Sequence, residues 1–512
     1  MSTSAWPIAI AATIVGAQSA VAQTVSPIRT ATPLQTTAPR SGSPLPPVRT
    51  LYQALQRTYQ TSPTLMSERA ALRRLDSGVA LARSEGRPQL AARTVFEQDV
   101  HTTRNLGLGR DITVAGDVEQ ILFAGGRIRN TVKASRALVS AGRYDLRATE
   151  GEVLVEATTA YADLLRDREI RALNIDQVRV LEANLKAAQD RFRVNDLTKA
   201  DVAQSEARLL LARSNLALSQ GRLQATEENF ERVVGARADI LEPLPPLPPL
   251  PISAEAAEAA ALDGNLDLAA LVERVRAARL TVEATKGERQ PVLSAFVSST
   301  SANALGTADR RLGLPRGTLI NSATDVSAGM VLRWPLYQGG AVGARVRQAA
   351  DLSAQQIEQA IAAERLAVAS ARAAFAGWRN ALNAIDANTA AIAANQISLD
   401  SVKIEQTIGA RDLIDVLNAE QELLGSRVTL ASVRRDAYVF AMTLLNIIGR
   451  AQAAELAGGI GPIYDPNDSY RANANNWSDW SGGAQRPAAS TRTVPANVAS
   501  PVRGLSVERA SD

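Results

Sequence analysis

The sequence of 512 residues contains no cysteine and only one histidine, His101. The absence of cysteine excludes disulfides, thiolate metal sites and a lipidated N-terminal cysteine. A zinc site of histidine and cysteine cannot be built, and a histidine-based catalytic triad is not expected. No nucleophile, metal or phosphate constellation is found, so we expect neither enzyme activity nor a cofactor. His101 is interpreted as an exposed loop residue.

Aromatic residues are scarce, at 4%, and mean hydropathy is near zero. This composition suits long packed helices better than a thick globular core. Beyond the N-terminus, no segment approaches the roughly 18 continuous apolar residues of a transmembrane helix, so any membrane crossing would have to be a β-barrel. The net charge of +4 is slight for this length. No basic patch interleaved with aromatics is present, and we expect no nucleic-acid partner.

The N-terminal residues 1–22 contain an apolar stretch that ends in the small-residue pattern Ala20-Val21-Ala22. This pattern is typical of a cleaved export signal, although no lysine or arginine precedes Arg29. We therefore predict a signal peptide over 1–22 and an exported mature chain. Residues 23–50 are rich in proline, serine and threonine and are predicted to be a flexible leader.

The chain repeats itself at a fixed offset of 214 residues over about 115 positions without a gap. The offset relates these pairs: Gly125-Gly126 and Gly339-Gly340, Tyr161 and Phe375, Asp201 and Asp415, Glu206 and Glu420, Gly235 and Gly449. Upstream, Pro88 matches Pro291 at an offset of 203, so the second copy carries 11 extra residues between these points. We infer a duplicated structural unit with one enlarged surface loop.

Each copy contains two runs with strand-like alternation, 89–100 and 112–123 in the first, 291–302 and 325–337 in the second. Their length is close to that of a tilted strand that crosses a bilayer. Trp334 and Tyr337 lie where an interfacial aromatic girdle is expected. A soluble β-hairpin packed on a core is the alternative interpretation, and the export signal favours the membrane.

Each strand pair is followed by a predicted helical hairpin, over 126–235 and over 340–449. In the first, no proline interrupts the chain from Gly126 to Arg193, a helix about 100 Å long. A break precedes Thr198, a suitable N-cap, and the returning helix ends at Gly235. The returning helix and a helix over 51–86 are each about half as long, so the two would match the long helix if stacked end to end.

The returning helix carries apolar residues seven apart: Val202, Leu209, Leu216, Leu223 and Phe230. This heptad predicts left-handed coiled-coil packing. It does not by itself separate a helical barrel from an antiparallel coiled coil without a pore.

The predicted organisation is therefore a first repeat over 51–242 and a second repeat over 254–450, joined by a proline-rich linker over 243–253. The linker is expected to be a stiff polyproline II spacer. Residues 451–512 lose all periodicity and are predicted to be mostly disordered, although the patch 463–466, Trp477 and Trp480 could dock locally.

Four strands of membrane length cannot close a barrel, and open sheet edges are not viable in lipid. Closure requires several copies, and three copies supply twelve strands, an allowed even number. The predicted fold is a mixed α/β membrane protein. It forms a trimeric 12-stranded β-barrel that is continued by a 12-helix α-barrel.

Over about residues 50–450 the chain resembles the TolC-like outer-membrane factors of tripartite efflux and type I secretion systems. The resemblance rests on the Leu-Phe-x-Gly-Gly element at 122–126 and its copy ending at Gly340, on Ala160-Tyr161, and on the hairpin tips around 191–209 and 405–423. It implies a homotrimeric conduit without catalysis in the outer membrane of a Gram-negative bacterium, with its helices in the periplasm. The implied partners are outer-membrane lipid, a periplasmic adaptor and an inner-membrane pump of the ABC or RND type.

The resemblance also implies site residues. Asp415 would form a constriction ring, Arg411 would latch it, and Asp201 matches the first-half aspartate of the family. The adaptor would dock at the tips, which comprise Val194, Asn195, Asp196, Leu197, Thr198, Ile408, Gly409 and Ala410. The strand-to-helix turns would be Gly125, Gly126, Gly339 and Gly340. The chain departs from the family pattern at Asn195, Ala200, Gln406 and Asn418, which leaves the exact latch open.

Two other classes of protein share the coiled-coil pattern of this sequence. A periplasmic coiled-coil adaptor would normally carry one helical hairpin in compact β domains, whereas this chain has two equivalent strand pairs. The second alternative class is a secreted coiled-coil scaffold. The sequence does not specify whether the cargo is a drug, a protein or a polysaccharide.

Overall fold

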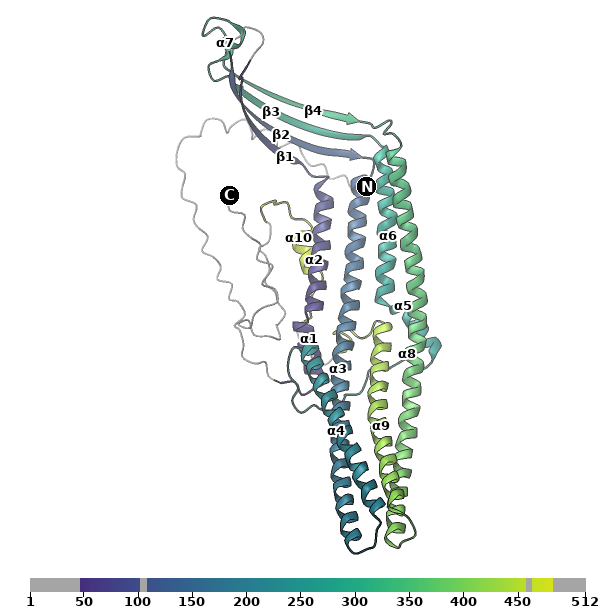
Figure 1. Ribbon diagram of the computed structural model, residues 1–512. Coiled ribbons are helices and arrows are strands. Elements are labelled where there is room, and N and C mark those ends of the chain that lie inside the picture. Colours follow the sequence, from purple (N-terminus) through teal and green to yellow (C-terminus); the bar gives the residue numbers. More distant parts are fainter. Residues whose placement is uncertain (1–46, 102–107, 457–462, 482–512) are drawn as a thin grey trace. The chain divides into compact units, whose positions relative to one another are not determined.

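The computed structural model describes residues 47–101, 108–456 and 463–481. The predicted signal peptide and most of the predicted leader, up to residue 46, lie outside this part, as do 457–462 and 482–512 of the predicted tail. The described residues form one four-stranded sheet and a set of long helices (Figure 1). None of the described helices is both long and apolar enough to span a membrane.

The duplication predicted from the sequence is present in the structure. The first half comprises α1 (Leu51–Thr61), α2 (Pro63–Ser84), β1 (Gln89–Gln98), β2 (Arg110–Ala124), α3 (Arg127–Arg193) and α4 (Lys199–Val234). The second half comprises α5 (Ala254–Gly264), α6 (Leu266–Lys286), a 3-10 turn (Gly287–Arg289), β3 (Val292–Asn303), α7 (Ala308–Leu312), β4 (Ser322–Arg333), α8 (Ala341–Thr407) and α9 (Leu413–Ile447). The long helices α3 and α8 both have 67 residues.

The sheet joins the two halves. All neighbours are antiparallel in the order β1-β2-β3-β4, and β2 of the first copy pairs with β3 of the second, with Gly116 opposite Ser299. Within the chain, β1 and β4 are paired on one side only. The enlarged loop of the second copy carries α7, and Arg311 on it forms ion pairs with Asp99 (3.1 Å) and Asp111 (2.9 Å) of the first copy.

The boundaries of the first three strands lie within two residues of the predicted ones, but the prediction of a strand over 325–337 was wrong at both ends. β4 begins earlier, at Ser322, and ends at Arg333. Pro335 has no backbone N–H to donate to the ladder, which explains why the strand stops before it. Trp334 and Tyr337 are exposed residues of the connection between β4 and α8.

Tight glycine turns connect the sheet to the long helices. Gly125 and Gly126 have φ of 59° and 80°, and Gly339 and Gly340 have φ of 60° and 80°. A side chain at Gly125 would also collide with the Cβ of Gln290. Both pairs therefore lie at backbone positions that glycine adopts most readily.

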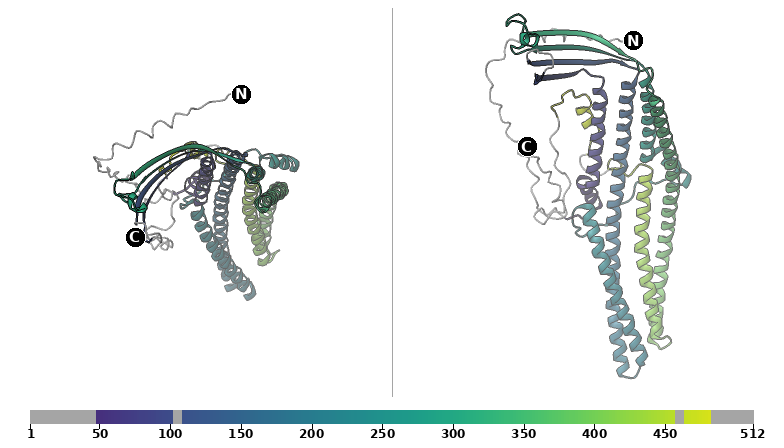
Figure 2. Two further views of the ribbon diagram at one scale, coloured as in Figure 1. Left: turned by 90° about the horizontal axis from the view of Figure 1, so that it is seen from above. Right: turned by 45° about the horizontal axis from the view of Figure 1, so that its top comes forward.

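Half-length helices stack end to end along the long ones, as predicted for the first half (Figures 1 and 2). Where the end of α4 meets the start of α1, the Val48 N–H donates to the carbonyl of Arg237 at 3.0 Å, and the Asp239 N–H donates to the carbonyl of Val48 at 2.9 Å. In the second half, the Asn265 side chain donates to the carbonyl of Ile447 at 3.0 Å.

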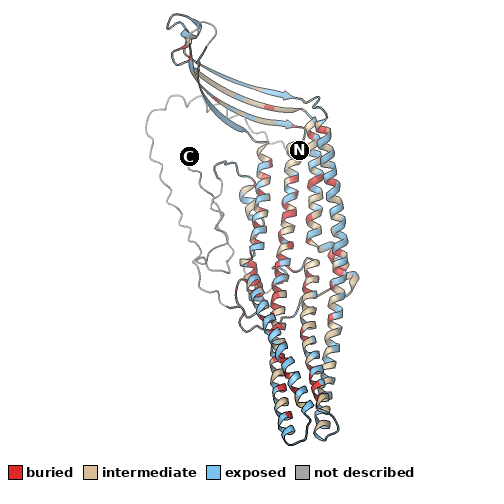
Figure 3. Ribbon diagram, viewed as in Figure 1, coloured by how far each residue is buried: buried red, intermediate tan, exposed pale blue. Residues whose placement is uncertain are grey.

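The main apolar core lies around this junction, where buried residues are frequent on the ribbon (Figure 3). Tyr161 and Phe230 are fully buried, with ring centroids 6.4 Å apart. The Tyr161 hydroxyl lies 2.7 Å from the carbonyl of Glu242. Burial raises the pKa of Tyr161 to about 12, so the hydroxyl remains a donor at neutral pH.

The proline-rich linker packs on this core in addition to joining the halves. Leu241, just before the linker, and Leu244, Leu247 and Leu250 within it contact the core at a spacing of three residues. Because a polyproline II helix has three residues per turn, this spacing places all four side chains on one face. The linker is therefore anchored along its length.

The prediction that 451–512 is mostly disordered is wrong for the described segments, 451–456 and 463–481, whereas the expected local docking of the patch 463–466 and of Trp477 is confirmed. Ala451 and Ala453 are buried in the main core. In the second segment, α10 (Asp468–Asn473) packs against α2. Composition alone missed this order because the segment is held by aromatic and arginine contacts with residues almost 400 positions away.

Candidate functional site

The first helical tip, between α3 and α4, is shaped by local polar contacts. Asn195 adopts φ of 60°, which asparagine tolerates better than most residues. Thr198 is the N-cap of α4 and forms a capping box with Asp201. The Thr198 N–H donates to Asp201 Oδ2 at 2.8 Å, and the Asp201 N–H donates to Thr198 Oγ1 at 3.3 Å.

These contacts give Asp201 a structural role in the tip of a single chain. The hydrogen bond from the Thr198 hydroxyl, 2.7 Å from Asp201 Oδ2, is the main cause that lowers the pKa of this carboxyl. The carboxylate is therefore ionised at neutral pH and stabilises the first turn of α4.

The second tip, between α8 and α9, has a glycine where the first has asparagine. Gly409 adopts φ of 80°, and Asp412 is the N-cap of α9, without a side-chain capping bond. Arg411 Nε lies 2.9 Å from Glu405 Oε2, and its Nη1 lies 3.7 Å from Asp415 Oδ2. The hydrogen bond with Glu405 is the first cause that raises the pKa of Arg411.

Two of the three residues predicted for the constriction are thus brought together, Arg411 and Asp415. The third, Asp201, lies on the other tip and is engaged by Thr198. Among the described residues of one chain, Arg411 pairs with Glu405 and Asp415 rather than with Asp201.

The two hairpins contact one another through residues that the sequence did not single out for this role. Arg208 on α4 donates to the side-chain oxygen of Asn418 on α9 at 2.8 Å. Asn184 on α3 donates to Glu420 at 2.9 Å, and Lys403 on α8 lies 3.2 Å from the other oxygen of that carboxylate. In the sequence, Asn418 stands out only as a departure from a family pattern, and Glu420 only as the counterpart of Glu206 in the internal repeat.

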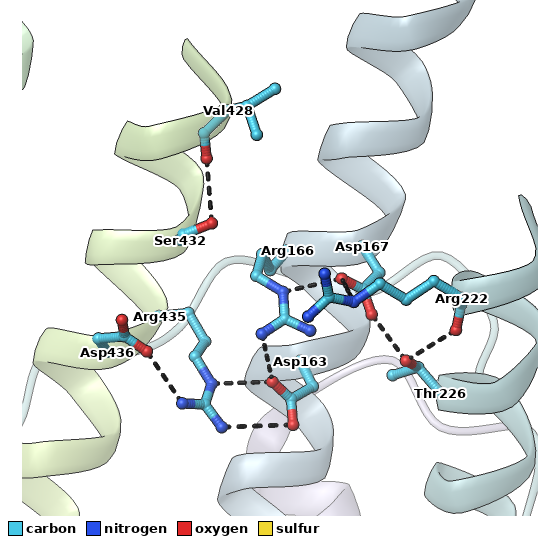
Figure 4. Close-up of polar contacts among 9 residues, drawn as sticks. All are labelled: Asp163, Arg166, Asp167, Arg222, Thr226, Val428, Ser432, Arg435 and Asp436. Atoms are coloured by element: carbon cyan, nitrogen blue, oxygen red, sulfur yellow. Dashed lines mark hydrogen bonds and ion pairs between the residues drawn. The ribbon is translucent and has the colours of Figure 1, made fainter. Parts of the chain in front are cut away.

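A second set of polar contacts ties α3 to both returning helices (Figure 4). Arg435 on α9 pairs with Asp163 on α3, 2.8 Å apart, and Arg166 bonds Asp167 at 2.8 Å. The Thr226 hydroxyl of α4 donates to Asp167 at 2.6 Å. Burial by itself would raise the pKa of Asp167, but these donors outweigh it and lower the pKa, so the side chain is ionised at neutral pH.

Both tips expose apolar side chains to solvent. Val194 is 73% exposed and Ile408 is 76% exposed. Phe192 and Ile404, within one helical turn of them, are exposed as well, and grouped exposed apolar side chains mark surfaces that bind another protein. In the described part of the chain, no cluster of three or more histidine, aspartate or glutamate side chains could hold a metal ion.

Comparison with known proteins now identifies the family. The model of the family described as outer membrane efflux protein matches residues 54–236 and 259–450. The chain belongs to the outer membrane efflux protein family. Membership makes it an exit duct for efflux or type I secretion in the outer membrane, with a periplasmic helical portion. This is a family of channels and not of enzymes, and it decides against the adaptor and scaffold alternatives.

Individual relatives agree with this assignment. The chain is 30% identical to the outer membrane efflux protein BepC of Brucella suis, over 84% of this chain and 91% of that protein. It is 22% identical to the outer membrane protein TolC of Escherichia coli, over 73% of this chain and 81% of that protein. The Campylobacter jejuni CmeC outer membrane channel has the same fold, with a TM-score of 0.70 at 14% identity over 83% and 89% of the two chains.

Proposed function

We propose that three copies of this chain assemble into one duct, a twelve-stranded barrel in the outer membrane continued by a barrel of periplasmic helices. The observation that carries the proposal is the open sheet, whose outer strands β1 and β4 are paired on one side only. An unpaired strand edge is not tolerated in lipid, so β1 of one copy must pair with β4 of the next. Three copies of a four-stranded sheet give an even-numbered barrel.

Cross-linking tests this closure directly, because the chain has no cysteine of its own. Thr94 and Ala328 each lie five residues from the helix-proximal end of their strand, β1 and β4. A chain carrying Thr94→Cys and Ala328→Cys should form a covalent trimer on oxidation, and the native mass in detergent should be that of three copies. Neither Thr94→Cys alone nor Ala328→Cys alone should yield the covalent trimer. A monomeric mass in detergent would contradict the proposal.

The helical tips are proposed to be the docking site of a periplasmic adaptor, which links the duct to an inner-membrane pump of the ABC or RND type. The support is the exposed apolar pair Val194 and Ile408 at the two tips. Val194→Asp combined with Ile408→Asp should abolish adaptor capture and export while the trimer remains intact. The matched control is Val180→Asp on α3, an exposed position on a helix that α4 and α9 of the same chain flank. Unchanged export in the tip variant would exclude these residues from docking.

The narrowest point of the closed duct is proposed to lie at Asp415, with Arg411 holding the tip closed. Three copies of a carboxylate around a narrow axis would concentrate negative potential and attract polyvalent cations. Arg411 offsets part of this charge in its own tip, since it lies close to both Glu405 and Asp415. In the assembled duct, Arg411 could contact Asp201 of a neighbouring hairpin at Oδ1 without breaking the cap, since both bonds from Thr198 go to Oδ2.

A further inference from the structure

The segment 463–481 follows α2 towards the sheet. It begins beside α1, where the Tyr464 N–H donates to the Tyr59 hydroxyl oxygen at 3.0 Å. The buried Arg69 guanidinium lies between two rings, 4.7 Å from the centroid of Tyr59 and 4.9 Å from that of Tyr464. This contact fixes the start of the segment.

The middle of the segment is held along α2 and α3. The guanidinium of Arg143 lies 5.4 Å from the Tyr470 ring centroid, within α10. Near the end of α2, Arg83 donates to the carbonyl of Ala474 at 2.6 Å. Arg69 and Arg83 are 14 residues apart on one helix, so the segment advances about 20 Å along α2.

The segment ends next to the first strand. Arg87, two residues before the start of β1, donates to the carbonyl of Asn476 at 2.5 Å. Its guanidinium lies 4.4 Å from the ring centroid of Trp477. Beyond this contact two indoles remain in solvent, since Trp477 is 68% exposed and Trp480 is 98% exposed.

We propose that 463–481 is a strap that carries Trp477 and Trp480 to the periplasmic surface of the outer membrane, where both side chains insert among the lipid headgroups. Tryptophan prefers the membrane–water interface because its ring is apolar and its N–H is polar. The strap contacts Arg87, which lies two residues before β1, the first of the strands proposed to span the membrane. Trp334 and Tyr337, at the same end of the sheet, are exposed as well. The inference rests on the proposal that the strands lie in the bilayer.

Fluorescence quenching by brominated lipids tests the contact. The chain has five tryptophans, and a variant that keeps only Trp480, with the others changed to phenylalanine, reports on this residue alone. It is reconstituted as a trimer in phosphatidylcholine–phosphatidylglycerol vesicles with bromine either close to the headgroup or near the ends of the acyl chains. We expect a large loss of Trp480 emission with the shallow bromine and a smaller loss with the deep one. A chain that keeps both Trp477 and Trp480 gives the same readout if the Trp480-only chain fails to assemble.

Two further single-tryptophan variants distinguish failure of the strap proposal from failure of strand insertion into the membrane. A Trp378-only chain should not be quenched, because that residue lies on α8 about 55 Å from the strand end. A Trp334-only chain reports on the strands themselves. Quenching of Trp334 without quenching of Trp480 would contradict membrane contact of the strap but would remain consistent with the barrel. It would favour a neighbouring subunit as the partner of the indoles. If neither residue is quenched, membrane insertion of the strands fails as well.

Discussion

Arg435 on α9 and Asp163 on α3 form a two-point ion pair between the duplicated halves, with Nε–Oδ1 at 2.8 Å and Nη2–Oδ2 at 3.4 Å. Both side chains are about one-fifth exposed, so the pair is shielded from water more than the surface pairs of the tips. The pair joins the returning helix of the second half to the long helix of the first (Figure 4).

Loss of this pair should destabilise the contact between the halves. Arg435→Ala leaves Asp163 with Arg166 as its remaining partner and should cost about 1.5–3 kcal/mol, the range for hydrogen bonds with charged groups. Thermal unfolding of the detergent-solubilised protein measures the loss. Arg179→Ala is the matched control, because the Arg179–Asp176 pair on α3 is largely exposed and should contribute little. Equal effects of the two variants would contradict a special role for Arg435.

The first tip should depend on its capping box. Thr198→Ala removes the hydroxyl that bonds the Asp201 N–H and carboxylate, and a lost N-cap costs about 1 kcal/mol. We expect faster hydrogen exchange in the first turns of α4, with no change in α9. Lys199→Ala at the neighbouring position is the control.

The stability of the first tip should also depend on pH through Asp201. The folded pKa of Asp201 lies below its unfolded value of about 3.9. Its stabilising effect is therefore complete above the unfolded pKa and is lost as the pH falls through the lower, folded pKa. Protection of α4 that stays constant into that acidic range would show that the carboxylate does not hold the cap.

The pH dependence of stability due to Glu150 on α3 has the opposite sign to that due to Asp201. Burial is the largest influence and raises its pKa, against the N–H of Ala453, which donates to the carboxylate at 2.6 Å. Because the folded pKa exceeds the unfolded value of about 4.3, ionisation of Glu150 costs stability as the pH rises above that value. Glu150→Gln keeps an oxygen for Ala453 without the charge.

The expected result is a higher melting temperature for Glu150→Gln at pH 7, with the gain shrinking to nothing below about pH 4. Melting curves of both proteins across this range decide the matter. Glu169→Gln on the same helix is the control, because this glutamate is exposed. A gain of equal size at every pH would mean that repacking, and not the charge, is responsible.

Local signals in the sequence predicted most of the architecture. The lack of proline from Gly126 to Arg193 and the glycine pairs before α3 and α8 located the hairpins. Thr198 was recognised as an N-cap because capping depends on residues three positions apart. The end of β4 was misplaced because the alternating pattern was extended past Pro335, a residue that cannot donate to the strand ladder.

The contacts between the halves could not be predicted in this way. Arg208 and Asn418 are 210 positions apart, and no periodicity relates them. Local docking of 463–466 and Trp477 was expected, but their partners were not, because each depends on a single arginine–aromatic contact such as that of Arg69 with Tyr464. Such contacts follow only from the three-dimensional course of the helices.

The proposed constriction allows a test in which Arg411 and Asp415 have different roles. Arg411 lies 3.7 Å from Asp415 and 2.9 Å from Glu405 within one tip. Arg411→Ser removes both contacts and should raise the basal conductance of single channels in planar bilayers. Because exposed ion pairs contribute only about 0–1 kcal/mol, the opening should be partial. Glu405→Gln should have the same direction of effect with a smaller size, since Asp415 still holds the arginine.

Asp415→Ala should instead reduce the block of the channel by di- and trivalent cations, because a ring of three carboxylates is removed from the axis. Trimer stability should hardly change, since the N-cap of α9 is Asp412. Asp412→Asn in the same turn is the control and should leave the cation block in place. If Asp415→Ala leaves the cation block unaltered, Asp415 does not line the constriction, and the narrowest point must be sought among the residues that join the hairpins, beginning with Asn418 and Arg208.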